Sequence, residues 1–269
     1  MILINGAESA VISAFDRGTA YGDGIFRTLR AGNRLPRNWP RHYAKLASDC
    51  AAIGLRCPAP GLLAGEVRRV CAVVEDCVVK VIVTRGVGSR GYRYDPEIQS
   101  TRIVMTSPLP DYPVGSSESG VRVRRCRLKL AQQPSLAGLK HLNRLENVLA
   151  RAEWSDANIA EGILSDTEGN VIGGTMTNLF TARTGALFTP ALDRCGVAGV
   201  TRERVMHAAA RHGIACHTTR LSWDDVLDAD EIILVNSIAG AWPVRELEGR
   251  AYNPGPLTRA IQEWLRQDD

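Results

Sequence analysis

One lysine, Lys140, stands where a polar loop gives way to a helical pattern, in the stretch SLAGLKHLNRLENVLARAEW. A lysine amine attacks carbonyl groups when its surroundings keep part of it neutral. The apolar residues that follow recur at the spacing that predicts an amphipathic helix: Leu142, Leu145, Leu149 and Ala152. Most lysines are solvated charges, so a reactive Lys140 needs support from other parts of the chain.

Two polar turns are suited to holding a phosphate group. In CGVAGVTRERV a glycine-containing turn leads into a helix at Val200 and Thr201, whose free N–H groups and positive dipole end favour an anion. In LVNSIAG, Asn236 and Ser237 follow an apolar strand and can add donors to the same seat. Each pattern also occurs in ordinary turns. Together with a nucleophilic lysine they indicate pyridoxal 5′-phosphate, which is held by its phosphate and by a Schiff base.

The rest of the composition argues against other classes of site. The 269 residues are 45% hydrophobic and 23% charged, which is typical of a folded soluble protein. The net charge of +4 is distributed along the sequence. In the basic stretch VRVRRCRLKL, arginines alternate with apolar residues as in a strand with one solvent-exposed face, so nucleic-acid binding is not expected. The seven cysteines form no CxxC pair, and the five histidines lack ligand spacing, which argues against a metal site.

Common catalytic and targeting signatures are also missing from the sequence. It contains no G-x-S-x-G, no P-loop and no G-x-G-x-x-G after a strand. The start, MILINGAESAVISAF, does not read as a signal peptide, and no apolar run is long enough for a membrane span. We therefore expect a cytoplasmic protein that acts on a small molecule.

The sequence predicts two α/β lobes, and their helices and strands must position Lys140 and the two turns. The first half predicts short strands around one helix: a hairpin of residues 1–15 turning at Asn5-Gly6, a helix at 41–55 ended by Gly54, and strands at 77–86 and 101–109. The second half predicts hairpins at Glu168-Gly169 and Thr184-Gly185, a strand from residue 231, and helices at 199–214 and 255–267. The expected organisation is a small domain at 1–112, a linker at 113–120 and a large cofactor-binding domain at 121–269.

From LINGAESAVISAFDRGTAYGDGIFRTLR to VNSIAGAWPV, the sequence resembles the class IV (fold type IV) pyridoxal-phosphate enzymes. These include D-amino-acid and branched-chain aminotransferases and 4-amino-4-deoxychorismate lyase; LAGLKHLNRLENVLAR and SRGYRY are most similar to the lyase. The resemblance implies the two-lobed α/β (α+β) fold of that group and a homodimer. It also implies conversion of 4-amino-4-deoxychorismate to 4-aminobenzoate and pyruvate, a step of folate biosynthesis. A class IV aminotransferase and a catalytically impaired paralogue stay open as alternatives.

The resemblance assigns cofactor contacts by position. Lys140 is the Schiff-base lysine, and the phosphate seat comprises Lys45, Val200, Thr201, Asn236 and Ser237. Lys45 departs from the family, which usually has an arginine at this position. A guanidinium that can donate two parallel hydrogen bonds to the phosphate is therefore replaced by an ammonium group on a flexible side chain. Gly173, in GGTMTNLF, stands where the family has a glutamate beside the pyridine nitrogen of the cofactor.

The resemblance also suggests contacts for the two carboxylates of the substrate. Arg27, Arg90 and Arg144 are placed in the family's substrate-binding segments, with Tyr92 beside them. Arg27 stands where the transaminases usually carry glutamate, so IFRTLR argues against transamination.

Overall fold

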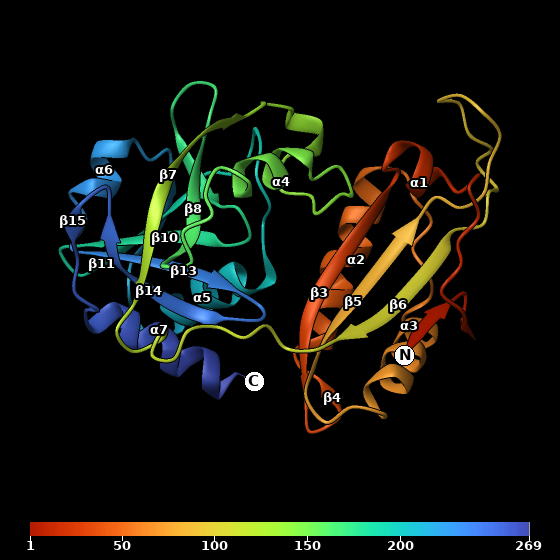
Figure 1. Ribbon diagram of the computed structural model, residues 1–269, viewed down its shortest axis with the longest axis horizontal. Helices are drawn as coiled ribbons and strands as arrows, with labels where there is room; N and C mark the ends of the chain where they lie inside the picture. Colours follow the sequence, from red (N-terminus) through yellow and green to blue (C-terminus); the bar gives the residue numbers. More distant parts are fainter. Residues whose placement is uncertain (269) are drawn as a thin grey trace. The chain divides into compact units, whose positions relative to one another are not determined.

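The computed structural model describes residues 1–268 and divides them into two compact units (Figure 1). Unit 1 contains Met1–Pro110 and the short segment Leu139–Asn143. Unit 2 contains Asp111–Gly138 and the chain from Arg144 onward. Lys140 therefore belongs to the first unit, although its sequence position placed it in the expected large domain.

Unit 1 is built on an antiparallel sheet of six strands in the order β2-β1-β6-β5-β3-β4. The long central strand β5 is rich in β-branched residues, which suit a sheet buried on one face. Asn5 and Gly6 both have positive φ, as the predicted tight hairpin requires. The strands are β1 (Ile2–Ile4), β2 (Ala7–Glu8), β3 (Gly24–Gly32), β4 (Leu35–Pro36), β5 (Cys77–Thr84) and β6 (Thr101–Ser107).

The helices of unit 1 are α1 (Arg17–Tyr21), α2 (Trp39–Ala52) and α3 (Pro60–Cys71). Helix α2 is the predicted helix, and its apolar face packs in the core of the unit through Leu46 and Cys50. The prediction of a single long helix was wrong, because α3 begins at Pro60 and buries a second apolar face. A strand over residues 9–15 was also wrong: Val11 is 80% exposed and only Ala7–Glu8 pairs with β1.

Unit 2 contains a sheet of nine strands in the order β12-β11-β10-β13-β14-β7-β8-β9, with β15 paired to β14. The pairs β7–β8, β7–β14 and β11–β12 are parallel and the others are antiparallel. Both predicted hairpins form, with positive φ at Gly169 and at Thr184 and Gly185. The strands are β7 (Val121–Leu130), β8 (Ile159–Asp166), β9 (Val171–Gly174), β10 (Asn178–Arg183), β11 (Ala186–Pro190), β12 (Cys216–Thr219), β13 (Glu231–Asn236), β14 (Gly240–Leu247) and β15 (Arg250–Ala251).

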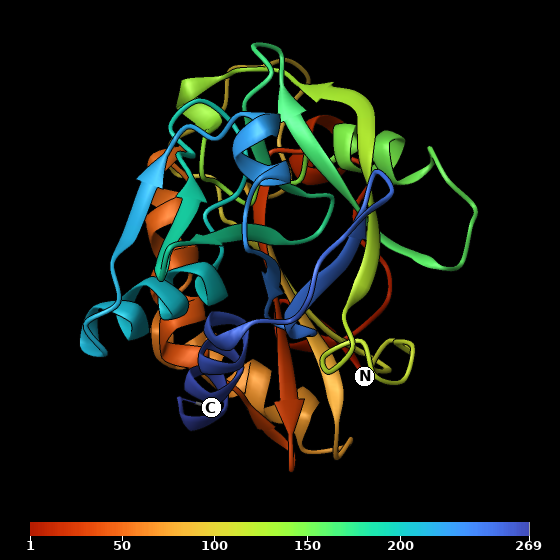
Figure 2. The ribbon, with the colours of Figure 1, turned by 90° about the vertical axis from the view of Figure 1, so that its left-hand side faces the viewer.

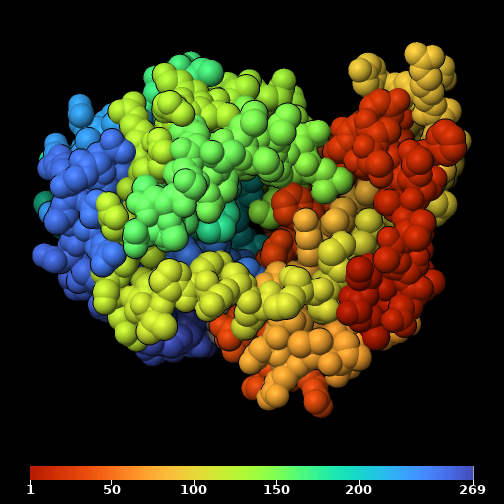
Figure 3. Space-filling model, viewed as in Figure 1, coloured from red at the N-terminus to blue at the C-terminus, as the bar shows by residue number. Residues whose placement is uncertain are grey.

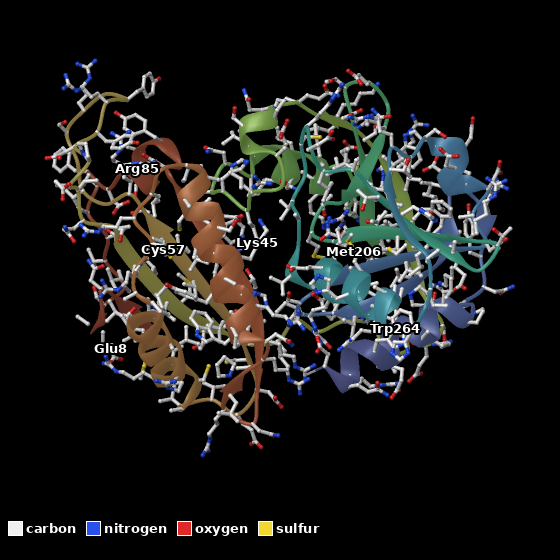
Figure 4. All side chains as sticks on the ribbon, turned by 180° about the vertical axis from the view of Figure 1, so that it is seen from behind. Glu8, Lys45, Cys57, Arg85, Met206 and Trp264 are labelled. Carbon is white, nitrogen blue, oxygen red and sulfur yellow. The ribbon has the colours of Figure 1, made fainter. Side chains whose placement is uncertain are left out.

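Two long helices of unit 2 cover one part of its sheet. Helices α5 (Val200–Arg211) and α7 (Pro256–Gln267) share a core with β10 and β13, and Figure 2 shows both beside the strands. Met206 on α5 and Trp264 on α7 are labelled in Figure 4, and the His212 ring stacks on Trp264 at 5.0 Å. The remaining helices are α4 (Leu145–Arg151), α6 (Trp223–Leu227) and the 3₁₀ turn η1 (Pro134–Leu136).

The predicted helix after Lys140 is shorter than expected and does not bury the expected face. Helix α4 begins at Leu145, so Leu142 lies outside it. Leu145 and Leu149 are 68% and 53% exposed. The helix starts late because residues 139–143 are extended and pair with β3.

Among residues 1–268, no helix combines the length and apolar character that crossing a membrane requires. Over the same residues, no group of three or more histidine, cysteine, aspartate or glutamate side chains is arranged to hold a metal ion.

Candidate active site

Lys140 lies in an extended segment beside the edge of β3. The Phe26 N–H donates to the Lys140 carbonyl at 2.9 Å, and the Leu142 N–H donates to the Gly24 carbonyl at 3.0 Å. The Lys140 side chain is partly buried, and its Nζ lies 4.7 Å from the centroid of the Phe26 ring. The backbone of the candidate nucleophile is therefore fixed, while its amine extends along an aromatic face.

Gly138, the residue before this segment, belongs to unit 2 and is hydrogen-bonded within that unit. The Gly138 N–H donates to the Gly196 carbonyl at 3.1 Å, and the Ala198 N–H donates to the Gly138 carbonyl at 3.0 Å. These bonds fix Gly138 against the turn that leads into α5. Only Leu139 separates Gly138 from Lys140 in the sequence.

Arg27 and Lys45 share one buried carboxylate in unit 1. Arg27 on β3 is 2% exposed, and its Nη2 donates to Asp49 Oδ2. Lys45 projects from α2 (Figure 4), and its Nζ donates to Asp49 Oδ1. Burial lowers the pKa of the Arg27 guanidinium, and the Asp49 carboxylate acts in the opposite direction. Arg27 as a substrate contact and Lys45 as a phosphate contact stay predictions.

The backbone of the loop that carries Arg90 and Tyr92 is tethered, while these two side chains are exposed. Arg17 donates to the carbonyls of Gly91 and Tyr92 at 2.8 and 3.1 Å, and also to Asp23 at 2.9 Å. Tyr92 is 86% exposed and Arg90 is exposed as well. The side chains of Arg90 and Tyr92 are therefore accessible to a ligand, as a contact with substrate requires.

Asp23 is the anchor of that tether. It accepts from Arg85 at 2.8 Å as well as from Arg17. Burial alone raises the pKa of Asp23, but the hydrogen bonds from Arg85 and Arg17 outweigh it and lower the pKa. Arg85 in turn donates to the carbonyls of Gly54 and Ile53, so the loop base is fixed to the end of α2.

The two turns that were predicted to hold a phosphate lie in unit 2, at the start of α5 and at the end of β13. No side chain caps the N-terminus of α5, so its first-turn N–H groups are not covered by a capping side chain. Thr201 Oγ1 and Ser237 Oγ lie 3.1 Å apart, which brings the two predicted turns together. The Asn236 side chain closes its own turn, because Oδ1 accepts from the N–H groups of Ile238 and Ala239 at 2.9 and 2.7 Å.

Gly173 lies at the end of β9, where a side chain would not fit the present backbone. Its φ is +156°, and a Cβ there would lie 2.9 Å from the Thr177 carbonyl oxygen. The turn that follows is held by Glu161, which is fully buried on β8. Glu161 accepts hydrogen bonds from the backbone or side chains of Gly162, Thr175, Met176 and Thr177.

Glu161 therefore supports the turn next to Gly173. Burial raises the pKa of its carboxyl group, and the hydrogen bonds from Thr175 and the neighbouring donors act in the opposite direction. Asn147 on α4 also donates to the Thr175 carbonyl at 2.8 Å. Arg144 directly precedes α4, and burial lowers the pKa of its guanidinium. The role of Arg144 as a substrate contact stays a prediction.

The sequence model of the family described as amino-transferase class IV matches residues 24–247, which is most of the chain. The chain belongs to the class IV aminotransferase family. This membership confirms the resemblance, and with it the two-lobed α/β fold of type IV.

Two relatives of this class IV chain are lyases. Aminodeoxychorismate lyase of Vibrio harveyi is 30% identical, over 97% of this chain and 98% of that protein. The crystal structure of 4-amino-4-deoxychorismate lyase from Pseudomonas aeruginosa is 44% identical, with a TM-score of 0.95 over 100% of this chain and 99% of that one. D-alanine aminotransferase of Bacillus licheniformis is also similar, at 25% identity over 98% of this chain and 95% of that protein.

The structure of this class IV chain also reveals polar residues that the sequence did not identify. Asp49 and Asp23 are buried or nearly so, and each accepts hydrogen bonds from donors of separate segments. In the sequence each is one acidic residue among many. A weak signal existed for Asp49, which follows Lys45 by four residues and directly precedes Cys50 on the predicted apolar face.

Proposed function

We propose that this class IV protein is a pyridoxal-phosphate-dependent lyase that converts 4-amino-4-deoxychorismate to 4-aminobenzoate and pyruvate. The observation that carries the proposal is the 44% identity to the Pseudomonas aeruginosa lyase over the whole chain. Arg27 adds support, because the transaminases that the sequence resembles usually have glutamate at this position.

The residues present fit the proposed cofactor. Lys140 would hold the aldehyde group of pyridoxal phosphate, since its amine is partly buried on a fixed backbone. The start of α5 with Thr201 and Ser237 would hold the phosphate through N–H and hydroxyl donors. When bound, the cofactor supplies a carbonyl carbon for the substrate amine and a ring that withdraws electrons.

The remaining chemistry is done by residues of the chain. As a free amine, Lys140 would move a proton from the ring carbon of the substrate and assist the departure of pyruvate. Formation of the aromatic product provides driving force for this elimination. The exposed Arg90 and Tyr92 and the partly buried Arg144 would orient the two substrate carboxylates.

The test is a product assay with the purified protein. Incubated with pyridoxal phosphate and 4-amino-4-deoxychorismate, it is expected to release 4-aminobenzoate and pyruvate in equal amounts. Chromatography measures the first product and a coupled lactate dehydrogenase assay the second. Absence of both products from a folded, cofactor-loaded protein would refute the proposal.

Aminotransfer is the second candidate function. A putative branched-chain-amino-acid aminotransferase of Methanocaldococcus jannaschii is 31% identical over 95% of this chain and 90% of that protein. The same preparation tested with D-alanine or leucine and 2-oxoglutarate would detect this activity.

We also infer that the protein forms a homodimer, as the family resemblance implies. Helix α4 supports this, because Leu145, Val148 and Leu149 are 68%, 60% and 53% exposed on a short helix. The segment around α4 lies on the viewed face in Figure 3, where a second copy has access to it. The cytoplasmic location stays a prediction from the sequence.

Charged residues on α4 are expected to weaken this dimer. Val148→Asp combined with Leu149→Asp should shift the protein from dimer to monomer in light-scattering measurements, because an apolar contact cannot accommodate two buried carboxylates. Val114→Asp is the matched control, since the Val114 side chain is fully exposed. A wild-type monomer, or a charged variant that remains dimeric, would contradict the inference.

A further inference from the structure

Asp49 is the point at which three segments of unit 1 meet. Its side chain is fully buried, and both carboxylate oxygens are occupied. Oδ1 accepts from Lys45 Nζ on the same helix, and Oδ2 accepts from Arg27 Nη2 on β3. Oδ2 also accepts from the backbone N–H of Lys140 at 3.1 Å. A buried carboxylate is stable only with such partners, so the three contacts depend on one another.

The contact between Asp49 and Lys140 lies at the end of a short strand pairing with β3. Ile25 and His141 form an antiparallel bridge, flanked by the Phe26-to-Lys140 and Leu142-to-Gly24 hydrogen bonds. If the ladder continued regularly, the Lys140 N–H would donate to the carbonyl of Phe26. It donates to Asp49 instead. The pairing therefore ends at Lys140, whose peptide is held by β3 on its carbonyl side and by α2 on its N–H side.

We propose that Asp49 is a positioning residue for Lys140: its Oδ2 ends the strand pairing and fixes the peptide from which the reactive amine extends. This inference rests on the proposed role of Lys140 as the cofactor lysine. Asp49 itself touches neither the cofactor nor the substrate in this scheme. It acts by limiting the positions from which the Lys140 side chain can reach an aldehyde.

The obvious variant, Asp49→Ala, confounds two effects. It removes the acceptor for Lys140, and it also leaves the buried Arg27 guanidinium without its carboxylate, which is strongly destabilising in itself. Two double variants avoid this difficulty. Arg27→Met with Asp49→Asn removes the ion pair but retains an oxygen acceptor at position 49. Arg27→Met with Asp49→Leu removes the ion pair and the acceptor, with a side chain of similar size.

Three measurements separate positioning from general loss of structure. Hydrogen exchange at the Lys140 amide reports the bond to position 49 directly. Capture of pyridoxal phosphate, in which the Lys140 amine condenses with the aldehyde and releases water, is followed by borohydride reduction and peptide mapping. Binding of pyridoxine 5′-phosphate, which has an alcohol in place of the aldehyde, reports the phosphate seat without the lysine.

The leucine double variant is expected to exchange its Lys140 amide at least about tenfold faster than the asparagine double variant, and to capture pyridoxal phosphate about tenfold more slowly. Affinity for pyridoxine 5′-phosphate should agree within about twofold between them, because both variants remove the carboxylate that pairs with Lys45 and both leave Thr201 and Ser237 unchanged. Glu66→Gln is the matched control for loss of a buried carboxylate, since Glu66 pairs with Arg102 at 2.9 Å in the same unit. It should leave capture unchanged.

Two outcomes would overturn the inference: equal capture rates in the two double variants, or a parallel loss of capture and of pyridoxine 5′-phosphate binding. Failure of the wild-type protein to form an adduct at Lys140 has a different meaning. It would refute the proposed role of Lys140, and the exchange measurement would still show whether Asp49 fixes that peptide.

Discussion

Replacement of Lys140 with alanine is expected to abolish turnover of 4-amino-4-deoxychorismate, with a loss of at least about a thousandfold. The reason is that one amine both holds the cofactor and moves the proton in the proposed reaction. Pyruvate release measures the turnover. The visible absorbance of the protein-bound cofactor should disappear in the same variant, since no other group is proposed to replace the lysine.

Lys80 offers a matched control for this substitution. Its Nζ lies 5.0 Å from the centroid of the Phe26 ring, and Lys140 Nζ lies 4.7 Å from the same centroid. Lys80→Ala removes a similar cation from the same ring and should retain turnover and absorbance. If Lys140→Ala kept its turnover, or if Lys80→Ala lost it to the same extent, the assignment of Lys140 would be wrong.

The second large effect is expected in the choice of reaction. The native protein should process 4-amino-4-deoxychorismate with a kcat/KM at least about a hundredfold above that for amino transfer from D-alanine or leucine. A carboxylate near a cation changes its protonation equilibrium by about ten- to a thousandfold. Gly173, which the family resemblance places beside the ring nitrogen, provides no carboxylate. Transamination depends strongly on electron withdrawal by the protonated ring. An elimination depends on it less, because formation of the aromatic product drives the reaction.

Parallel assays of pyruvate release and of amino transfer to 2-oxoglutarate measure this ratio in one preparation. A protein that transfers amino groups rapidly while leaving 4-amino-4-deoxychorismate intact would reverse the conclusion. Gly173→Glu is not a simple way to restore the missing carboxylate. A Cβ at Gly173 meets the Thr177 carbonyl oxygen at 2.9 Å, so the backbone that Glu161 supports would have to move first.

Features that depend on local chemistry could be predicted from the sequence. The hairpin at Asn5-Gly6 forms because both residues tolerate positive φ, and α2 forms where apolar residues recur at helical spacing. The start of α5 was also predictable, because the glycine-containing turn that ends at Gly199 leads into a helix at Val200. Thr201 and Ser237 approach because β13 and α5 pack together, which their separate patterns did not show.

Features that depend on distant pairing could not be predicted. The helix after Lys140 was expected to begin near Leu142, but residues 139–143 join the edge of β3 and delay it to Leu145. The role of Asp49 was missed for the same reason. An acidic side chain normally reads as solvated, and only the tertiary structure shows the donors that surround it.

The pairing of Lys140 with β3 also has a consequence for synthesis on the ribosome. Nearly all of unit 1 precedes Pro110 and can begin to fold early, as N-terminal domains generally do. Its edge at Gly24–Phe26 acquires its final strand only after residues 139–143 have left the exit tunnel. Until then the N-terminal unit exposes unpaired backbone groups and an Asp49 carboxylate that lacks its Lys140 partner. A nascent chain stalled shortly before Lys140 is thus an incomplete folding unit, open to chaperones or to wrong strand pairing.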